Sequence, residues 1–404
     1  MNVAVICELN PMHNGHEAVF KFARNLGSGG NTVVAVMSGN YCQRGEPALI
    51  DKWSRAKMAV LGGADIVLEI PSVFAQQSAQ FFADAAVDVV CKSGICDALV
   101  FGSECGDIEL LKGLAGKRAA GDFGDAVKKL MDSGLSYPRA LSAFYGVELG
   151  ANDTLGVEYI VALEKRLAAV EVSCMKRIGG NVHGSCDMDE GSEIAGAAAI
   201  RKYICEKEAG QDGGLERIRK FMPESSLEIL DELVKEGRFV RSLNKYNALI
   251  IGKLRELGPE GIGELPFAGG GLAECVYSEA CRTSDTANLI ASATSKTFTS
   301  GRIRRILLAT LTGARQTMIR NRIDVPYVRV LGVSAERKDL LSELSDAKVP
   351  VIFGNIPKDY RTVFSCNGAD LLALEILATD YYVLGFETAN APAHLELTMP
   401  LIKV

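Results

Sequence analysis

A chain of 404 residues, of which 48% are hydrophobic and 23% charged, has the composition of a globular protein and the length of two or three domains. Its apolar runs are too short to cross a bilayer and no secretory signal is evident, so we expect a cytoplasmic protein with no membrane partner. The formal charge of −6 argues against indiscriminate binding of nucleic acid. Eleven cysteines with no pair at metal-ligand spacing are expected to be reduced thiols, without a structural metal site.

Strands and helices alternate through the first hundred residues. Apolar runs at 3–6, 32–37, 65–70 and 98–101 predict strands, and helical patterns lie between them at 17–25, 52–61 and 76–91. Strands that are apolar throughout, in this order, indicate an α/β fold with a Rossmann-like, doubly wound parallel sheet covered by helices on both faces. Ligands of such sheets bind beyond the carboxyl ends of the strands.

The rest of the chain is predicted to be mixed. A helical region reaches about residue 145 and is followed by a helix at 156–168 and a strand at 170–175. Glycines at 210, 213 and 214 indicate a linker, so we expect one domain at 1–209 and a mainly helical or mixed domain at 210–404. The later elements are predicted as helices at 225–236, 246–257 and 296–311, a glycine-rich loop at 258–271, and strands at 327–331 and 349–353.

The most informative motif follows the first strand. Residues 10–16 read Asn-Pro-Met-His-Asn-Gly-His, and the helical pattern after them places His13 and His16 at a helix N-terminus, where anions bind. Two imidazoles three residues apart, with Gly15 between them so that a phosphate can approach the backbone, could grip a triphosphate and stabilise charge at its α-phosphorus. The alternative is a polar loop in which His16 merely caps a helix. The flanking strand and helix favour the nucleotide site.

Two more turns at the same predicted sheet edge suit a nucleotide. Arg44 follows the second strand and could meet a phosphate, and Gly102 follows the fourth and could let the chain pass against an adenine ring. The sequence has no Gly-x-x-x-x-Gly-Lys-Ser/Thr phosphate loop, no dinucleotide fingerprint after the first strand and no nucleophile elbow. Bound ATP would therefore be held by the histidine motif.

One segment departs from the acidic average. Residues 296–322 contain no Asp or Glu and seven cations, among them Lys296, Arg302, Arg304 and Arg305. A solvated basic helix is the simple interpretation, and a face for a polyanion is the alternative that the contrast with the rest of the chain favours.

Taken in order, these residues resemble the tRNA(Met) cytidine acetate ligase family of the His-x-Gly-His nucleotidyltransferase superfamily. The resemblance rests on segments spread over most of the chain: 8–16, 35–40, 43–48, 52–53, 101–104, 155–159, 176–179, 294–296, 302–305 and 329–332. Such enzymes use ATP to convert acetate into acetyl-adenylate, then pass the acetyl group to the exocyclic amine of the wobble cytidine of elongator tRNA(Met).

The resemblance implies specific substrates and site residues. It implies ATP and acetate as substrates, Mg²⁺ bound with the nucleotide, and elongator tRNA(Met) as partner, and it leaves a homo-oligomer open. His13, His16 and Arg44 would be catalytic, and the four named cations of the basic segment would contact the tRNA. The ATP site would comprise Ile6, Cys7, Glu8, Leu9, Asn10, Pro11, Met12, Gly15, Gly102, Asn152, Arg177, Ile178 and Arg201.

One departure from the family pattern concerns phosphate binding. Members usually carry Ser-Ala-Thr-x-Ile-Arg, whereas residues 196–201 read Gly-Ala-Ala-Ala-Ile-Arg, so Arg201 is kept and both hydroxyls are missing. Losing a neutral hydrogen bond to a charged group weakens binding by about 1.5–3 kcal/mol, if the bond forms in the transition state.

Two alternative functions remain open on these residues. The first is a small-molecule or acetate-activating adenylyltransferase with an acceptor other than RNA, which the histidine motif alone would support equally well. The second is an RNA-binding relative whose catalytic segment has decayed at 196–199, against which the intact His13, His16, Arg44 and Arg177 weigh.

Overall fold

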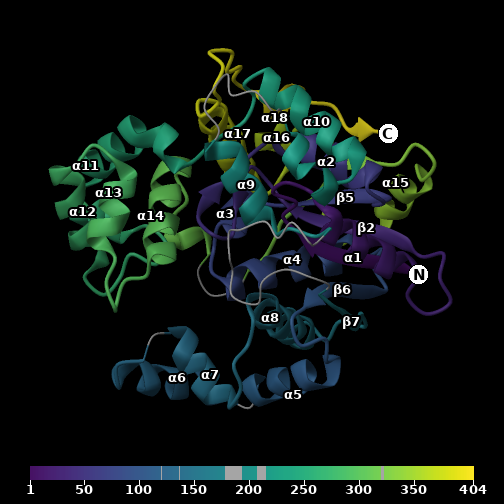
Figure 1. The fold of residues 1–404 in the computed structure, drawn as a ribbon, viewed down its shortest axis with the longest axis horizontal. Coiled ribbons are helices and arrows are strands. Elements are labelled where there is room, and N and C mark those ends of the chain that lie inside the picture. Colours follow the sequence, from purple (N-terminus) through teal and green to yellow (C-terminus); the bar gives the residue numbers. More distant parts are fainter. Residues whose placement is uncertain (120, 136, 178–192, 207–214, 320–322) are drawn as a thin grey trace.

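The computed structural model describes the whole chain except residues 120, 136, 178–192, 207–214 and 320–322 (Figure 1). Its centre is a sheet in which β5, β2, β1, β6 and β7 lie in this order and run parallel. β8 pairs antiparallel with β5, and β9 and β10 both pair parallel with β8. The strands of this sheet are β1 (Asn2–Cys7), β2 (Thr32–Ser38), β5 (Ile66–Ile70), β6 (Ala98–Ser103), β7 (Glu171–Lys176), β8 (Val328–Val333), β9 (Val351–Phe353) and β10 (Ile402–Lys403).

Alternate residues of the central strands belong to two separate cores. Val3 and Val5 of β1 lie in one core with α1 (Asn14–Arg24), α2 (Lys52–Leu61) and α10 (Glu224–Lys235). Ala4 and Ile6 lie in the other core with α4 (Ala79–Ser93), α5 (Ile108–Ala119) and α8 (Ala151–Lys165). Because successive side chains of a strand point to opposite faces, a strand buried on both faces must be apolar along its middle, as β1 and β2 are between their terminal residues.

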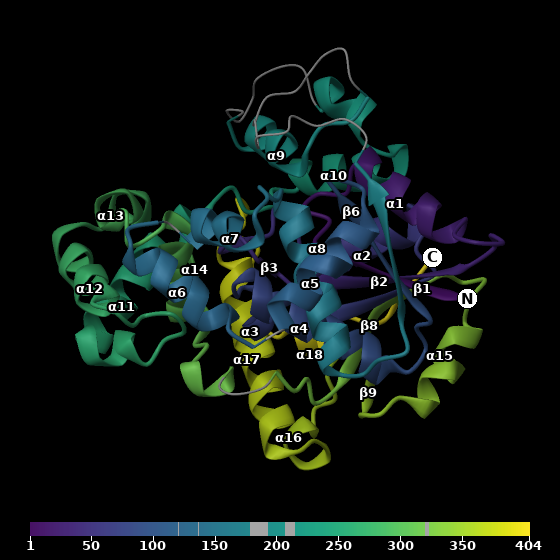
Figure 2. The same cartoon turned by 90° about the horizontal axis from the view of Figure 1, so that it is seen from below.

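Four helices form a lobe beyond one side of the sheet in both views (Figures 1 and 2). This helical lobe consists of α11 (Asn247–Gly263), α12 (Leu272–Arg282), α13 (Thr286–Ala293) and α14 (Ser300–Thr312). The helix α17 (Cys366–Val383) joins the lobe to the sheet because it packs against both α14 and α3 (Ser72–Ala75). None of the helices in the described part of the chain is long and apolar enough to cross a bilayer.

Shorter elements complete the chain. A hairpin of β3 (Tyr41–Cys42) and β4 (Glu46–Pro47) follows β2. The remaining α-helices are α6 (Phe123–Asp132), α7 (Tyr137–Tyr145), α9 (Ala197–Glu206), α15 (Asp339–Glu343), α16 (Tyr360–Val363) and α18 (Leu395–Thr398), and short 3₁₀ turns cover Glu216–Phe221, Leu243–Tyr246, Gln316–Met318 and Leu344–Asp346.

The predicted fold class is confirmed, and two element predictions need correction. The segment 258–271, predicted as a loop, is helical again up to Gly263 after a break at Gly258, whose φ of 63° is the left-handed conformation that glycine adopts easily. The helix predicted from residue 296 begins at Ser300, because the Thr299 side chain accepts a hydrogen bond from the backbone N–H of Arg302 and caps the helix there. The division at residue 209 stays a prediction; the sheet continues across it, since β8 pairs with β5.

A buried ionic cluster connects distant parts of the chain. Lys52 pairs with Glu69 and lies 2.7 Å from Glu396, and Arg329 pairs with the same two carboxylates. All four side chains are at most 2% exposed. Glu375 lies beside them and accepts hydrogen bonds from the backbone N–H and the hydroxyl of Ser72. Burial raises the pKa of Glu375 to about 8, so at neutral pH it is protonated and two cations face two anions.

Glu375 is expected to make the free energy of unfolding depend on pH, and replacing it by glutamine should remove this dependence. The pKa of Glu375 is about 8 in the folded chain and 4.5 when unperturbed, so between these pH values the unfolded chain releases the proton first. The free energy of unfolding of the wild type should therefore fall as pH rises from 5 to 8 through this group, and glutamine has no proton to release. Urea unfolding at pH 5, 6.5 and 8 measures the effect. Parallel pH profiles for the two proteins would contradict it.

Candidate nucleotide-binding site

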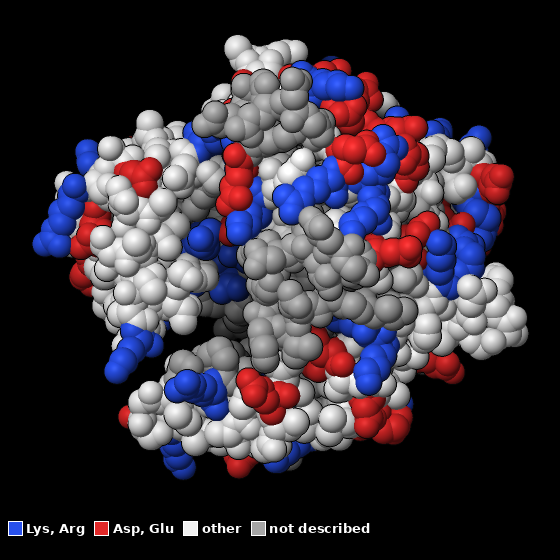
Figure 3. All heavy atoms as spheres, viewed as in Figure 1, with Lys and Arg blue, Asp and Glu red and all other residues white. Residues whose placement is uncertain are grey.

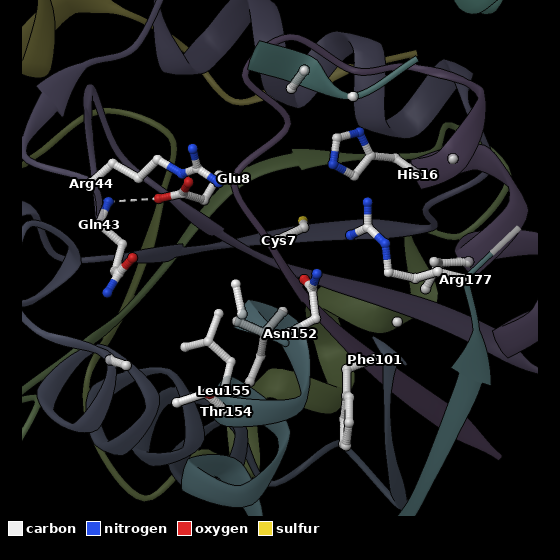
Figure 4. Close-up of a pocket in the computed structure, with 18 of the residues that line it drawn as sticks. Cys7, Glu8, His16, Gln43, Arg44, Phe101, Asn152, Thr154, Leu155 and Arg177 are labelled. Carbon is white, nitrogen blue, oxygen red and sulfur yellow. Dashed lines mark hydrogen bonds between the residues drawn. The ribbon is translucent and has the colours of Figure 1, made fainter. Parts of the chain in front are cut away.

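A cavity of about 900 Å³ opens beyond the carboxyl ends of β1 and β6 (Figure 4). β1 lies between β2 and β6 in the sheet. The strands that follow it in sequence are therefore added first on one side, as β2 and β5, and then on the other side, as β6 and β7. This switch point is where open α/β sheets bind ligands. The cavity walls come from the end of β1, the start of α1, the β3–β4 hairpin, α7, and the first turns of α8 and α9.

His13 and His16 lie together in this cavity at the N-terminus of α1. His13 is the N-cap residue, and its Nδ1 accepts a hydrogen bond from the N–H of Gly15 at 3.0 Å. The Nδ1 of His16 accepts in turn from the N–H of His13 at 3.3 Å, which completes a capping box, and the ring centroids are 3.9 Å apart. Because both Nδ1 atoms accept, each neutral ring carries its proton on Nε2 and can donate it to a ligand.

The electrostatics of the pair keep both rings neutral. Burial lowers the pKa of His13 well below its usual value, and the neighbouring His16, Arg177 and Arg201 lower it further. Burial and Arg177 lower the pKa of His16 to about 4. A site with two neutral Nε2–H donors and a helix N-terminus has the polarity to receive phosphate oxygens. Gly15 is required at this point because a Cβ there would lie 2.8 Å from Cε1 of His13.

Four arginines of the described residues line the cavity, namely Arg44, Arg139, Arg177 and Arg201. Among the described residues, the side chains of Arg44 and Arg177 have no hydrogen-bond or ion-pair partner, so both are available to a ligand. Arg201 donates from Nη1 to the carbonyl of Asn10 at 2.7 Å, and its other nitrogen is 3.9 Å from Glu46. Arg201 thereby joins the histidine turn to α9.

The start of α9 reaches the cavity without a side-chain hydroxyl. Gly196, Ala197 and Ala198 line the cavity immediately before Arg201, at the position where the family pattern has hydroxyls. No atom lies within 4 Å of a Cβ built on Gly196, so a larger side chain would fit there. The backbone N–H groups of this helix start still offer positive partial charge to an anion.

The opposite wall is held by a carboxylate network. Asn152, at the start of α8, lines the cavity and donates from Nδ2 to Glu104 at 2.6 Å. Asp153 accepts from the hydroxyl of Ser103 and from the N–H of Glu104, which fixes the turn after β6. Gly102 lies at the end of β6, where an added Cβ would lie 3.5 Å from Cγ of Arg177.

The structure gathers most of the predicted ATP-site residues around one cavity. Those that line it are Ile6, Cys7, Glu8, Leu9, Asn10, His13, Gly15, His16, Arg44, Gly102, Asn152, Arg177 and Arg201. Pro11 and Met12 are buried and do not line it, and Met12 fills the space beside Gly62 instead. Ile178 lies outside the described residues.

An apolar wall was missed by the sequence analysis. Phe82, Phe101, Leu155 and Tyr159 line the cavity, and the rings of Phe101 and Tyr159 are 5.7 Å apart. Phe101 fits closely over α8 because Gly156 has no side chain; a Cβ there would lie 2.3 Å from the ring. The available sequence signal for this wall was an apolar residue followed by glycine, at Phe101-Gly102 and at Leu155-Gly156. The contact between these two segments is set by the fold.

Three of the four predicted nucleic-acid contacts bond to the protein itself. Arg302 donates to the carbonyls of Phe267 and Gly269. Arg304 pairs with Glu46 at 2.6 Å, and Arg305 donates to the carbonyl of Gln43 at 3.2 Å. Lys296 is exposed in the loop between α13 and α14.

The helical lobe therefore contacts the cavity wall. Through Arg304 and Arg305, α14 holds the β3–β4 hairpin that carries Arg44. Figure 3 shows a hollow between the lobe and the rest of the molecule, with Lys and Arg side chains gathered at its edge.

Comparison with known proteins assigns the family. A model of the HIGH nucleotidyl transferase family matches residues 1–395. A protein of Acetivibrio thermocellus named tRNA(Met) cytidine acetate ligase is 32% identical, with 99% of each chain covered, and one of the same name from Caldanaerobacter subterraneus subsp. tengcongensis is 32% identical over 100% of this chain and 99% of that protein.

Solved structures agree with these relatives. TmcAL of Thermotoga maritima with bound alpha-thio ATP superposes with a TM-score of 0.87 at 29% identity, and its apo form with a TM-score of 0.89, each over 100% of both chains. The histidine pair at the switch point, the full-length sequence similarity and the shared fold lead to one assignment: the chain belongs to the tRNA(Met) cytidine acetate ligase family of HIGH nucleotidyl transferases.

Proposed function

We propose that this chain activates acetate with ATP as acetyl-adenylate and acetylates the exocyclic amine of the wobble cytidine of elongator tRNA(Met) in the cytoplasm. The observation that carries the proposal is a pair of neutral imidazoles beside the guanidinium groups of Arg44 and Arg177. Among the described residues, neither the two Nε2 atoms nor these two guanidinium groups have a hydrogen-bond partner. Relatives over the full length carry the name of this activity.

The cavity residues can be assigned roles in the first step. An acetate oxygen attacks the α-phosphorus of ATP, and the bond to pyrophosphate breaks. His13 and His16 donate Nε2–H bonds to phosphate oxygens on which negative charge grows, while Arg44 and Arg177 supply positive charge. The apolar wall of Phe101 and Leu155 suits the adenine ring.

Mg²⁺ would enter with the nucleotide. Within the described part of the chain, no group of three or more His, Cys, Asp or Glu side chains is placed to hold a metal ion. The phosphate oxygens would then provide most ligands, as is usual for Mg²⁺ in nucleotide sites. When bound, the ion would neutralise phosphate charge.

A two-step assay tests the proposal. Acetate-dependent exchange of pyrophosphate into ATP reports the first step, and labelled acetate found as N4-acetylcytidine at the wobble position of elongator tRNA(Met) reports the second. A transcript with uridine at that position is the control and should stay unlabelled. Exchange without RNA labelling would replace the proposal by an adenylyltransferase with another acceptor, and absence of both would indicate a decayed relative.

Arg305 and Lys296 are expected to affect different steps. Arg305→Met removes the bond to the Gln43 carbonyl, so the hairpin that carries Arg44 loses an anchor and the pyrophosphate exchange rate should fall about tenfold. Lys296→Met changes an exposed cation and should weaken tRNA binding, reduce its salt dependence and leave exchange unchanged. Exchange kinetics and binding of tRNA at several salt concentrations measure both. Equal effects of the two substitutions on the pyrophosphate exchange rate would contradict the assignment of Arg305 and Lys296 to different steps.

A further inference from the structure

Three carboxylates line the cavity in the described part of the chain, and Glu8 differs from the other two. Glu46 is held by Arg304 at 2.6 Å, and Glu148 is exposed. Glu8 is half-buried, and its Oε1 accepts from the backbone N–H of Gln43 at 2.6 Å. Its Oε2 has no partner among the described residues. One oxygen therefore fixes the side chain and the other is free to meet a ligand.

Arg44 is the neighbouring unpaired group. Figure 4 shows Glu8, Gln43 and Arg44 on one side of the cavity, with His16 and Arg177 on the other. Burial raises the pKa of Glu8, and Arg201, Arg55 and Arg44 act in the opposite direction. A carboxylate with this environment takes up a proton more readily than an exposed glutamate does.

We propose that Glu8 and Arg44 form the subsite for the acceptor base, in which Glu8 accepts a hydrogen bond from the cytidine N4 amine and then takes its proton. This inference rests on the proposed function. After pyrophosphate has left, Arg44 is released from its phosphate contact and donates to N3 and O2 of the same base while acyl transfer takes place. The pair presents one acceptor and one donor group, which complements the base-pairing edge of cytosine.

The proton must leave the amine during transfer. The N4 nitrogen attacks the acetyl carbon of acetyl-adenylate, a C–N bond forms, and the bond from the acetyl carbon to the phosphate oxygen breaks, with its electron pair leaving on AMP. The N4 proton passes to Oε2 of Glu8 and later to solvent. The amine of cytosine is a weak nucleophile because its lone pair is delocalised into the ring, so a base within hydrogen-bond reach accelerates its attack.

The same two residues discriminate against uridine. Uracil has a carbonyl oxygen at the position of the amine and a proton on N3, so it would bring an acceptor toward the Glu8 carboxylate and a donor toward Arg44. Both contacts would be repulsive in a half-buried site. Glu8 is poorly suited to the alternative role of contacting the triphosphate, since like charges would meet at short range.

Glu8→Gln separates the two half-reactions. The amide oxygen of glutamine can still accept from Gln43, so the hairpin keeps its anchor and the pyrophosphate exchange rate should fall far less than the rate of acetyl transfer. Single-turnover acetyl transfer to elongator tRNA(Met) should fall about 10²–10⁴-fold, the usual contribution of a general base. Glu8→Asp, which keeps a carboxylate, should recover part of the transfer rate. Glu109→Gln, the same change at an exposed glutamate of α5, is the matched control.

Two further measurements test whether Glu8 acts as the base and contacts the wobble base. The transfer rate of wild type should rise with pH up to the pKa of Glu8 and then level, and this rise should be absent in Glu8→Gln. Anticodon stem-loops with cytidine or uridine at the wobble position should bind wild type with different affinities and Glu8→Gln with similar ones. Equal loss of exchange and transfer, a raised Mg²⁺ requirement for exchange, or unchanged transfer would each overturn the assignment. Failure of wild type to acetylate any tRNA would instead remove the proposed function itself.

Discussion

Replacing His13 by asparagine is expected to reduce acetate-dependent pyrophosphate exchange by about 10²–10³-fold, the cost of removing one donor that meets developing charge. Asparagine is a good N-cap residue, so it can take over the bond that Nδ1 of His13 accepts from Gly15 and keep the start of α1 intact. It cannot place a donor where Nε2 of the imidazole lies. The variant therefore separates the structural role of His13 from its chemical role.

The matched control is the same substitution at a distant histidine. His394 is exposed and lies in the left-handed region with φ of 61°, a conformation that asparagine tolerates. His394→Asn should exchange pyrophosphate like wild type. Both variants should have thermal midpoints within about 2 °C of wild type, which calorimetry measures. If His13→Asn loses stability in parallel with activity, the histidine is serving mainly as a cap.

Replacing Lys52 by methionine is expected to destabilise the fold by about 3–5 kcal/mol, because it leaves buried carboxylates with less compensating charge. Lys52 contacts both Glu69 and Glu396, and all three side chains are at most 2% exposed. Arg329 alone would then face two anions. Urea unfolding of the two proteins at pH 7 measures the difference in free energy.

A second substitution tests whether uncompensated buried charge is the cause of the lost stability in Lys52→Met. Adding Glu69→Gln to Lys52→Met removes one of the two anions and should restore part of the lost stability, although each change alone is destabilising. Lys235→Met breaks a pair with Asp231 in which the lysine side chain is 73% exposed, and it should change stability by less than about 1 kcal/mol. A double variant less stable than Lys52→Met would show that lost packing is the cause.

The histidine turn at 10–16 could be predicted because its signals are local. The strand, the two histidines and the following helix lie within the first 24 residues, and the short apolar run of the strand and the 3.6-residue period of the helix can be read directly there. The helix predicted at 52–61 matches α2 for the same reason. The place of Gly102 at the site followed from the rule that the carboxyl ends of parallel strands meet at one edge, whereas Asn152 and Arg177 were expected there only from the family resemblance.

Features set by distant contacts could not be predicted. The partners of Arg302, Arg304 and Arg305 lie 33 to 262 residues away, and a run of cations gives the same pattern whether it meets RNA or the protein's own carbonyls. The helix α17 was not assigned because residues on most sides of it are buried, which removes the amphipathic period. The partly free carboxylate of Glu8 depends on the hairpin that places Gln43 opposite it.

The pairing of β8 with β5 has a consequence for synthesis on the ribosome. β5 is translated early, yet its free edge is covered only when residues 328–333 emerge, and Glu396 reaches Lys52 only after residue 396 has been synthesised. A nascent chain interrupted before residue 328 would present an uncovered strand edge, and one interrupted between residues 333 and 396 would instead have two buried cations, Lys52 and Arg329, facing the single carboxylate of Glu69. Termination before residue 396 should thus yield no partially active nucleotide-binding fragment, so that activity requires both the covered sheet edge and the complete ionic cluster.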